Sequence, residues 1–466
     1  MARFVRRWCV TFMGVGAAAL LAVSGVGAQD VEERFPGVSL GLLYEGRSQP
    51  TLAIQPFLGR MGGESAASRA ENIVARDLRY SNRFMVMDSL PDGFVRDEVD
   101  YALWDQLGAT WLVTGRIEGA GSGSVLILDV HDVIYREVRQ SGRFSLPDPN
   151  SPEFRMAVHT ASDAAVEWIT GEPGIAASRI LFVRRMEDGS QDLWMVDSDG
   201  ENLHRVTRER AEDEGYGLIL SPAWSPDGGR VSYGSYRTGM PRIYEMNLVT
   251  GAERTVPTER TGDYITPTYH PDGDRLVFAV VGGGSSGLFS YNIAQECCFE
   301  RLTEGRWEDF SPSFSPDGNR YVFNSNRLGM GTPQIYLSGS GSDRPSIVSP
   351  YVYNRPGYYT SPEWSPRGNR VAYHGRIEQR GQHQIIVSEV DQRGRVARLT
   401  REGNNEDPSW APDGRHLVYV GERAWGRGLF IVDVETGTTR TLVSGMYVRM
   451  PAWSPSLAPR LAENEN

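Results

Sequence analysis

An octapeptide that recurs five times and is followed by a shortened sixth copy, together with a non-repeating segment before it, predicts two domains: an N-terminal α/β domain followed by a six-bladed β-propeller closed by the C-terminal strand. The pattern is Ser-Pro-x-aromatic-Ser-Pro-Asp-Gly, and successive copies begin 43–50 residues apart, with the first prolines at 222, 267, 312, 362, 408 and 451. A period in this range that carries several short strands is typical of propeller blades. Before residue 172 the repeat is absent, and helical and strand patterns alternate instead.

Each repeat predicts four strands. The aromatic strand runs into Ser-Pro-Asp-Gly, where proline presets the first turn dihedral and glycine occupies the last turn position. The sixth copy, Met450–Pro455, leaves no room for further strands before Asn466, whereas three strands predicted between Arg179 and Thr207 have no aromatic strand before them. We therefore expect these two fragments to form one blade that closes the ring and pairs its edges.

The segment before the propeller predicts three helices and four strands. The helices are expected at Glu64–Tyr80, at Asp97–Leu107 and from Pro152 to Ile169, and the strands at Thr51–Phe57, Phe84–Met87, Thr110–Gly115 and Val125–Val130. Gly171-Glu-Pro-Gly174 then breaks the helical pattern. The predicted divisions are an α/β domain at 29–172, the propeller at 177–456 and a polar tail at 457–466.

The first 28 residues predict a secretory signal peptide. Arg3, Arg6 and Arg7 precede an apolar stretch from Trp8 to about Val23, and Ser24–Ala28 supplies the small residues of a cleavage site. A transmembrane anchor is the alternative, but the stretch barely reaches spanning length. Residues 29–48 precede the first predicted strand, and we expect them to form a mobile arm.

The charged residues narrow the possible functions. All 48 basic residues are arginine, so lysine chemistry such as Schiff bases and phosphate-binding GxxxxGK[ST] loops is excluded. Without the three arginines of the signal, 45 basic residues face 59 acidic ones, a net charge of -14 compared with -11 for the whole chain. Nucleic acid and anionic membrane surfaces are therefore unfavourable partners.

Motifs that could carry chemistry favour structural interpretations. Gly283–Gly287 matches GxSxG, but no helix follows it, which favours a hairpin tip over a nucleophile elbow. Asp197–Gly200 favours a hairpin turn over a calcium loop. His374 and His383 are too far apart in sequence for a local ligand pair, so no metal or cofactor is predicted. The adjacent Cys297 and Cys298 leave a strained disulfide open, but two unpaired cysteines are the favoured interpretation.

Several segments resemble the TolB family. Asp100–Gly108 followed by Leu112–Arg116, His159–Asp163 with Thr170-Gly171, and Ser178–Val183 are similar to its N-terminal domain and domain junction, and Val448–Pro455 to its closing strand. The resemblance covers nearly all of the mature chain. Arg367 departs from it by replacing the usual Asp of the fourth octapeptide, and Ile265 and Tyr358-Tyr359 stand where asparagines are frequent.

The resemblance implies a non-enzymatic periplasmic component of the Tol–Pal system. In that family the propeller binds the peptidoglycan-associated lipoprotein Pal, the mobile N-terminal arm communicates with TolA, and the complex helps the outer membrane to invaginate during division. The protein would then be peripheral to the envelope and not membrane-spanning.

The loops that enter the inner strands of a propeller converge on one mouth of its central channel. Here these loops are aromatic and charged, as binding hot spots tend to be, although the aromatic residues could instead simply fill the channel. Our hypothesis is that the Pal site is lined by Tyr264, Trp307, Asp309, Tyr359, Asn405, Glu406, Tyr447 and Arg449. The alternative is an exported hydrolase or lyase acting on a polymer, for which Asp309 and Glu406 are the candidate acid/base pair.

Overall fold

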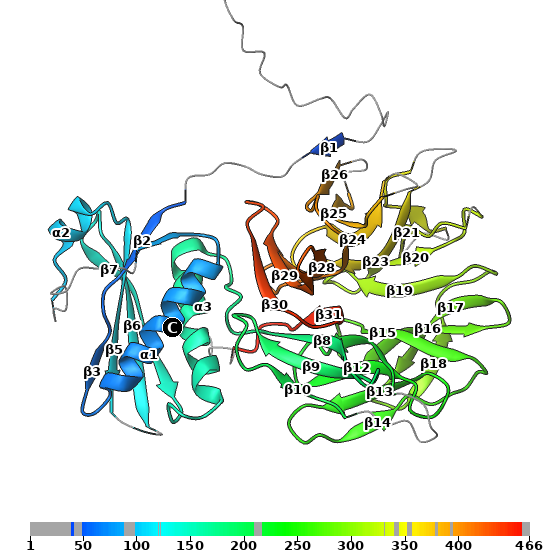
Figure 1. The fold of residues 1–466 in the computed structure, drawn as a ribbon, viewed down its shortest axis with the longest axis horizontal. Helices are drawn as coiled ribbons and strands as arrows, with labels where there is room; N and C mark the ends of the chain where they lie inside the picture. Colours follow the sequence, from blue (N-terminus) through cyan, green and yellow to red (C-terminus); the bar gives the residue numbers. More distant parts are fainter. Residues whose placement is uncertain are drawn as a thin grey trace, which may run out of the picture.

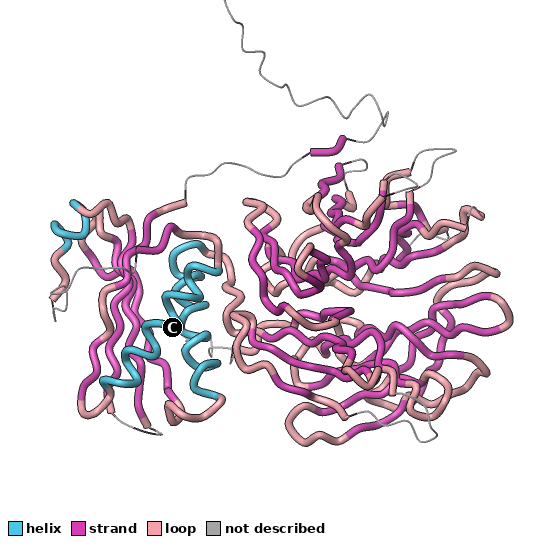
Figure 2. The backbone as a smooth tube through the Cα atoms, in the orientation of Figure 1, coloured by secondary structure: helices cyan, strands magenta, loops and turns pink. Residues whose placement is uncertain are grey.

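The computed structural model describes residues 39–41, 49–87, 98–119, 121, 123–208, 217–329, 331–339, 344–351, 357–377, 381–391 and 395–458. These residues form two domains that lie side by side (Figures 1 and 2). The predicted signal peptide, most of the predicted arm and the end of the predicted tail lie outside the described residues. No helix in the described ranges is long and apolar enough to cross a membrane.

The N-terminal domain is a mixed sheet with two long helices on the face towards the propeller (Figure 1). The strand order is β4-β2-β5-β6-β7, and β3 pairs with β5. The elements are β2 (Thr51–Ile54), β3 (Leu58–Arg60), α1 (Glu64–Tyr80), β4 (Met85–Met87), α2 (Tyr101–Gln106), β5 (Trp111–Glu118), β6 (Ser124–Asp132), β7 (Glu137–Leu146) and α3 (Glu153–Thr170).

The helices form where the apolar periodicity predicts them. On α1 the predicted apolar face, which includes Ala70, Ile73 and Leu78, is buried in the main core of the domain. The helix expected at 97–107 is shorter, because Asp100 caps it by accepting a hydrogen bond from the Leu103 amide (3.1 Å). At the end of α3, Gly171 adopts φ 73°, a left-handed conformation that favours glycine and stops the helix.

The propeller has six blades of four strands, as the repeat predicts. Blade 1 contains β8 (Arg179–Arg185), β9 (Gln191–Asp197), β10 (His204–Arg205) and β31 (Val448–Trp453); blade 2 contains β11 (Ile219–Trp224), β12 (Arg230–Ser235), β13 (Arg242–Asn247) and β14 (Glu253–Thr255); blade 3 contains β15 (Asp263–Tyr269), β16 (Arg275–Gly282), β17 (Ser285–Asn292) and β18 (Cys297–Arg301). Blade 4 contains β19 (Asp309–Phe314), β20 (Arg320–Ser325), β21 (Gln334–Gly339) and β22 (Ser346–Ile347); blade 5 contains β23 (Tyr358–Trp364), β24 (Arg370–Arg376), β25 (Gln384–Glu389) and β26 (Arg395–Arg398); blade 6 contains β27 (Asn405–Trp410), β28 (His416–Arg423), β29 (Gly426–Asp433) and β30 (Thr439–Ser444).

The ring closes through its last strand. Strand β31 pairs antiparallel with β8, so Val448 lies opposite Arg184 and Trp453 opposite Ile180. The Trp453 indole donates a hydrogen bond to the Ser178 hydroxyl (2.7 Å), and the Arg179 amide donates one to the Ser454 hydroxyl (2.9 Å). The expected first blade, assembled from both ends of the propeller sequence, is therefore confirmed.

Every inner strand carries a β-bulge that the sequence did not predict. In each octapeptide the residue before the first proline has φ between 49° and 52°, and the pairing with the second strand shifts register there. These residues are Ser221, Thr266, Ser311, Ser361, Asp407 and Met450. Some also tie neighbouring blades together, since the Thr266 hydroxyl accepts from the Ser311 amide (3.2 Å) and Asp407 from the Met450 amide (3.3 Å). The bulge therefore bends each inner strand, and in some blades it also links that strand to the next.

Three residues of the predicted arm are placed by the structure. Ser39–Gly41 form β1, which pairs in parallel with β26 at the outer edge of blade 5 and gives that blade a fifth strand. The mobility of the arm stays a prediction, because the residues on either side of β1 lie outside the described ranges.

The cysteines differ from the favoured expectation. Cys297 and Cys298, at the start of β18, form a disulfide with each other. Cys298 adopts φ 65°, a conformation outside the regular strand that brings the two adjacent side chains together. The expectation of two unpaired cysteines is therefore wrong.

We predict that Trp453→Ala lowers the free energy of unfolding by about 3–5 kcal/mol, because it removes a large buried side chain from the closing strand. Trp425→Ala is the matched control: its indole is 56% exposed, whereas that of Trp453 is 5% exposed, and we expect a change within about 0.5 kcal/mol. Denaturant unfolding measures both. Equal stability of the two variants would contradict the structural role of the closing strand.

Candidate functional site

The channel mouth lies at the end of the propeller that faces away from the N-terminal domain. Neighbouring strands of a blade are antiparallel, so the hairpins between second and third strands lie at the same end as the loops that enter the inner strands. The octapeptide turns lie at the other end. It is these turns that meet the N-terminal domain, as the next contacts show.

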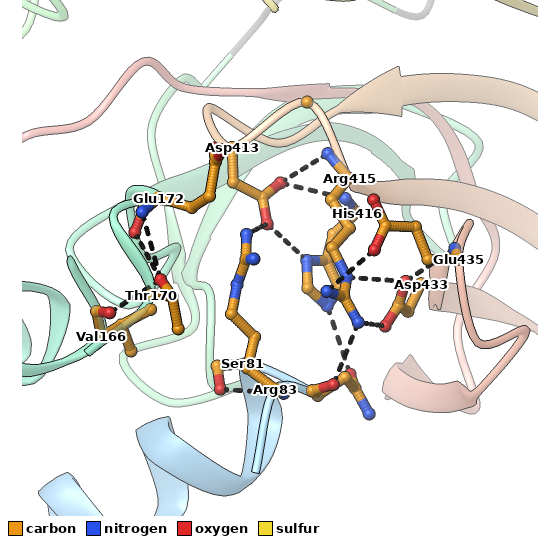
Figure 3. A network of polar contacts seen from close by, with 12 residues as sticks. Ser81, Arg83, Val166, Thr170, Glu172, Asp413, Arg415, His416, Asp433 and Glu435 are labelled. Atoms are coloured by element: carbon orange, nitrogen blue, oxygen red, sulfur yellow. Dashed lines mark hydrogen bonds and ion pairs between the residues drawn. The ribbon is translucent and has the colours of Figure 1, made fainter. Parts of the chain in front are cut away.

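Polar contacts join the domains at the octapeptide turns of blades 5 and 6, and Figure 3 shows those at blade 6. The Asn82 carbonyl accepts from Arg415 (3.0 Å), and its side-chain oxygen lies 3.2 Å from His416 Nε2. Arg83 lies 3.7 Å from the Asp413 carboxylate. Arg367, the departure from the family octapeptide, lies 3.4 Å from Glu172 of the domain linker. A cleft of about 890 Å³ remains between the domains here.

The structure divides the eight predicted mouth residues into two groups. Trp307 and Tyr447 are 39% and 45% exposed, and Glu406 and Arg449 are half-buried. The other four side chains are buried, and in this structure they shape the loops rather than offering a contact surface: Tyr264, Asp309, Tyr359 and Asn405. The partner-binding role of the set stays a prediction. It now rests on Trp307, Tyr447, Glu406 and Arg449, which are at least partly exposed.

The buried members hold loop backbone or a neighbouring charge. The Tyr264 hydroxyl donates to the Arg260 carbonyl (3.1 Å) and accepts from its amide (3.0 Å). Both oxygens of Asp309 accept hydrogen bonds from Arg327 at 2.9 Å. The side-chain amide of Asn405 donates a hydrogen bond to the Glu402 carbonyl (3.0 Å). These contacts fix the starts of three inner strands.

Arg427 organises the exposed part of the mouth, although the sequence did not single it out. Its guanidinium lies 3.0 Å from Glu406 and 2.9 Å from Glu422, and it donates to the Val448 carbonyl (2.9 Å). It also lies 5.0 Å from the centre of the Tyr447 ring, within reach of a cation–π interaction. Trp425, exposed in the same β28–β29 hairpin, was missed as well. The signal was available, because this hairpin lies at the mouth end of blade 6.

Two histidines meet beside this cluster, contrary to the expectation from their spacing. The rings of His374 and His383 lie 5.2 Å apart, and His383 stacks on Tyr358 at 5.3 Å. His374 Nδ1 accepts from the Asp407 amide (3.0 Å), and burial lowers the pKa of His374. His383 Nδ1 lies 3.1 Å from Glu406. Its hydrogen bond to Glu406 is the main reason why the pKa of that carboxyl falls to about 2.

The candidate acid/base pair has neither the pKa nor the exposure expected of catalytic carboxyl groups. A general acid or base works best with a pKa near the working pH, whereas that of Glu406 is held at about 2. Asp309 is 1% exposed, and both of its oxygens bind Arg327. The arrangement therefore favours fixed charges on a binding surface over proton transfer.

The GxSxG segment is a hairpin tip, as predicted. Gly283 and Gly284, at φ 62° and 81°, form the turn between β16 and β17, and Ser285 begins the next strand. Positive φ at both central residues is what a tight hairpin turn of this kind requires. Asp197–Gly200 likewise begins the turn between β9 and β10.

The fold and the mouth define a two-domain protein of the β-propeller class whose free face carries aromatic residues and arginines. The family model described as the TolB beta propeller domain matches residues 166–457, and the one described as the TolB amino-terminal domain matches residues 44–137. The chain belongs to the TolB family.

Individual relatives agree with the family match. The chain is 30% identical over 264 residues to the Tol-Pal system protein TolB of Methylococcus capsulatus, covering 55% of each chain. It is 33% identical over 216 residues to the protein of that name from Nitrosomonas europaea, covering 45% of this chain and 47% of the relative. It thus spans about half the length of the curated relatives it matches. The crystal structure of TolB from Acinetobacter baumannii superposes with a TM-score of 0.74 at 25% identity, covering 90% of this chain and 100% of that one.

We predict that Asp309→Asn destabilises the propeller by about 1–3 kcal/mol, because the nearly buried Arg327 loses its charged partner. Glu304→Gln is the control, since Glu304 is exposed and its ion pair with Arg301 is long, at 3.8 Å; we expect a change below about 0.5 kcal/mol. Chemical denaturation at pH 7 measures both. If Asp309→Asn were as stable as the unaltered protein, the Asp309–Arg327 pair would not hold the mouth in shape.

Proposed function

We propose that the protein is a non-enzymatic component of the Tol–Pal system and binds the lipoprotein Pal at the channel mouth. The observation that carries this proposal is the placement of exposed apolar side chains. On the described propeller residues, the large exposed apolar side chains at the mouth end are Met240, Trp307, Trp425 and Tyr447. Leu203 and Val249 lie at the opposite end.

The chemistry of these side chains suits a protein partner. Tryptophan, tyrosine and arginine are enriched among residues that dominate binding energy. Tryptophan and tyrosine bury a large area at a low cost in conformational entropy. Arg427 is held in advance by Glu406, Glu422 and the Val448 carbonyl, so binding need not order it. A partner on this face would not meet the N-terminal domain, which contacts the other end of the propeller.

The remaining parts of the proposal rest on the family and on the N-terminal sequence. Residues 1–28 direct export to the periplasm, where the protein stays peripheral to the envelope. The link to TolA is made by residues 29–48 or by the N-terminal domain. Through the two partners the protein supports envelope integrity and the invagination of the outer membrane during cell division.

We predict that the triple variant Trp307→Ala, Trp425→Ala, Tyr447→Ala weakens Pal binding at least about 100-fold, since each hot-spot aromatic contributes about 1–2 kcal/mol. The matched control is Leu203→Ala, Val249→Ala, Tyr135→Ala, which removes three exposed side chains away from the mouth. Titration calorimetry with purified Pal gives both affinities. Full affinity of the mouth variant would contradict the assignment of the site, and turnover of an envelope polymer by the purified protein would contradict the non-enzymatic role.

We also predict that deletion of residues 29–48 abolishes binding to TolA and leaves the affinity for Pal within about threefold of its original value. The reason is that the deleted segment leads into β2 of the N-terminal domain, whereas the mouth lies at the end of the propeller that faces away from that domain. Pull-down from cell envelope after mild cross-linking compares both partners in one sample. Recovery of TolA with the shortened protein would refute the role of the arm.

A further inference from the structure

A buried histidine lies between the two domains, apart from the channel mouth. His159 on α3 is 0% exposed. Its Nδ1 lies 2.8 Å from an oxygen of Asp77 on α1, and its Nε2 lies 3.9 Å from an oxygen of Asp199 in the turn after β9. One imidazole thus faces a carboxylate of its own domain and a carboxylate of the propeller.

Asp199 is also held by cations of the N-terminal domain. Arg155 and Arg76 both donate to the oxygen of Asp199 that faces His159, Arg76 at 3.3 Å. Arg76 reaches further along the same turn and lies 2.9 Å from Glu201. The other oxygen of Asp199 accepts from the Glu201 amide (3.1 Å). If His159 carries a proton, three cationic groups of the N-terminal domain, Arg155, Arg76 and His159, therefore surround Asp199 in this turn of blade 1.

Two buried polar atoms in this group lack hydrogen-bond partners. His159 Nε2 and Asp77 Oδ1 have no hydrogen-bond partner although both are buried. Neutral imidazole has one N–H, which the Asp77 contact uses, and its other nitrogen would then turn a lone pair towards the Asp199 carboxylate. A second proton converts that repulsion into attraction on both sides of the ring.

Three other charged or titratable groups around His159 have polar contacts of their own. Arg440 of β30 donates to the Ser198 carbonyl (2.7 Å) and lies 4.1 Å from the Tyr80 ring. Asp197 binds Arg179 at 3.0 Å and lies 4.0 Å from Arg155. Asp163, one turn further along α3, accepts from the Ala176 and Ala177 amides of the linker at 2.8 and 2.9 Å. Burial raises the pKa of Asp163 to about 7.

The three side chains Asp77, His159 and Asp199 are close enough together to hold a metal ion. The arginines argue against one, because a divalent cation bound to Asp199 would lie against the guanidinium groups of Arg155 and Arg76 and be repelled by them. A proton supplies one positive charge within the space that the ring already occupies. The electrostatics of the site therefore favour a proton over a metal.

We propose that a proton on His159 fastens the N-terminal domain to blade 1, so that the domain interface tightens as the pH falls and loosens as it rises. The contact joins α1 and α3 to the turn between β9 and β10, and Asp163 holds the linker between the same domains. The interface is then a pH-responsive device built into the fold.

The direction of the effect follows from the pKa values. Burial alone lowers the pKa of His159, but the attraction of Asp77 and Asp199 outweighs it and leaves the pKa above 6.5. The stabilising contribution is complete below pH 6.5 and is lost as the pH rises through the raised pKa. Asp163 acts in the same direction, since its contribution is present below pH 3.8 and is lost as the pH rises through about 7. A variant of His159 is therefore needed to separate its contribution to the pH dependence of stability from that of Asp163.

The test compares the mature protein with His159→Gln, which keeps a hydrogen-bond donor but cannot titrate. His204→Gln is the matched control, because His204 is exposed on β10 and its Nδ1 lies 2.6 Å from the backbone carbonyl of Asn202 rather than beside a carboxylate. Histidine NMR gives the pKa of His159 directly. Each unit by which it exceeds 6.5 changes the folding equilibrium up to about tenfold across the titration. We expect unfolding midpoints of the unaltered protein and of His204→Gln to fall between pH 7 and 9, and that fall to be much smaller in His159→Gln.

A second measurement does not depend on the variant folding. Spin labels are attached at Asn72→Cys on α1 and Val249→Cys on blade 2, both of which are exposed positions. Electron paramagnetic resonance then measures the distance between the two domains. We expect the distance distribution to broaden as the pH rises through the pKa of His159. A His159 pKa at or below 6.5, an unchanged distribution, or equal pH dependence in His159→Gln and the unaltered protein would each overturn the proposal. So would stoichiometric Zn²⁺ that stabilises the protein and removes its pH dependence, since the site would then hold a metal.

Discussion

The antiparallel pairing of β31 with β8 is the constraint on which the rest of the structure depends. A ring of blades has open sheet edges until its two ends join, and open edges neither hold their neighbours nor exclude other chains. Here the last strand supplies the inner edge of blade 1, and Trp453 fills the space between that blade and blade 6. Blade 1 also carries Asp199, so the strand that closes the ring also supports the turn to which the N-terminal domain binds.

The sequence was sufficient for the blades, the closure and most of the N-terminal domain, because these depend on periodicity. Strand β7 escaped because it is an edge strand whose side chains are mostly exposed, so no apolar alternation marks it. The bulges escaped because a residue before proline gives no sign of its positive φ. They also explain why two of the predicted mouth residues are buried. Tyr264 and Tyr359 are buried while the adjacent Ile265 and Tyr358 are partly exposed, and a register shift of one residue decides which neighbour faces the channel.

Contacts between residues distant in sequence account for the rest of the candidate site. His374 and His383 meet only because β24 and the start of β25 are neighbours, and Glu406 joins them from blade 6. Arg367 departs from the family octapeptide because it serves the domain linker instead of its own turn: the equivalent Asp227 and Asp317 accept hydrogen bonds within their turns, whereas Arg367 pairs with Glu172. A chain without lysine suits such contacts, since the planar guanidinium can bind two acceptors and an aromatic face together.

Blades 1 and 6 connect the two ends of the propeller. Blade 6 holds Glu406 and Arg427 at the mouth, and Asp413 and Arg415 against the N-terminal domain. Blade 1 places Arg185 beside Tyr447 at the mouth and Asp199 beside His159 at the other end. A partner bound at the mouth, as proposed, would occupy a different surface of these sheets from the N-terminal domain, and neither would exclude the other. Coupling between them requires a change in how the domain sits on these blades, and the charged contacts that set this position lie at the octapeptide turn of blade 6 and around His159.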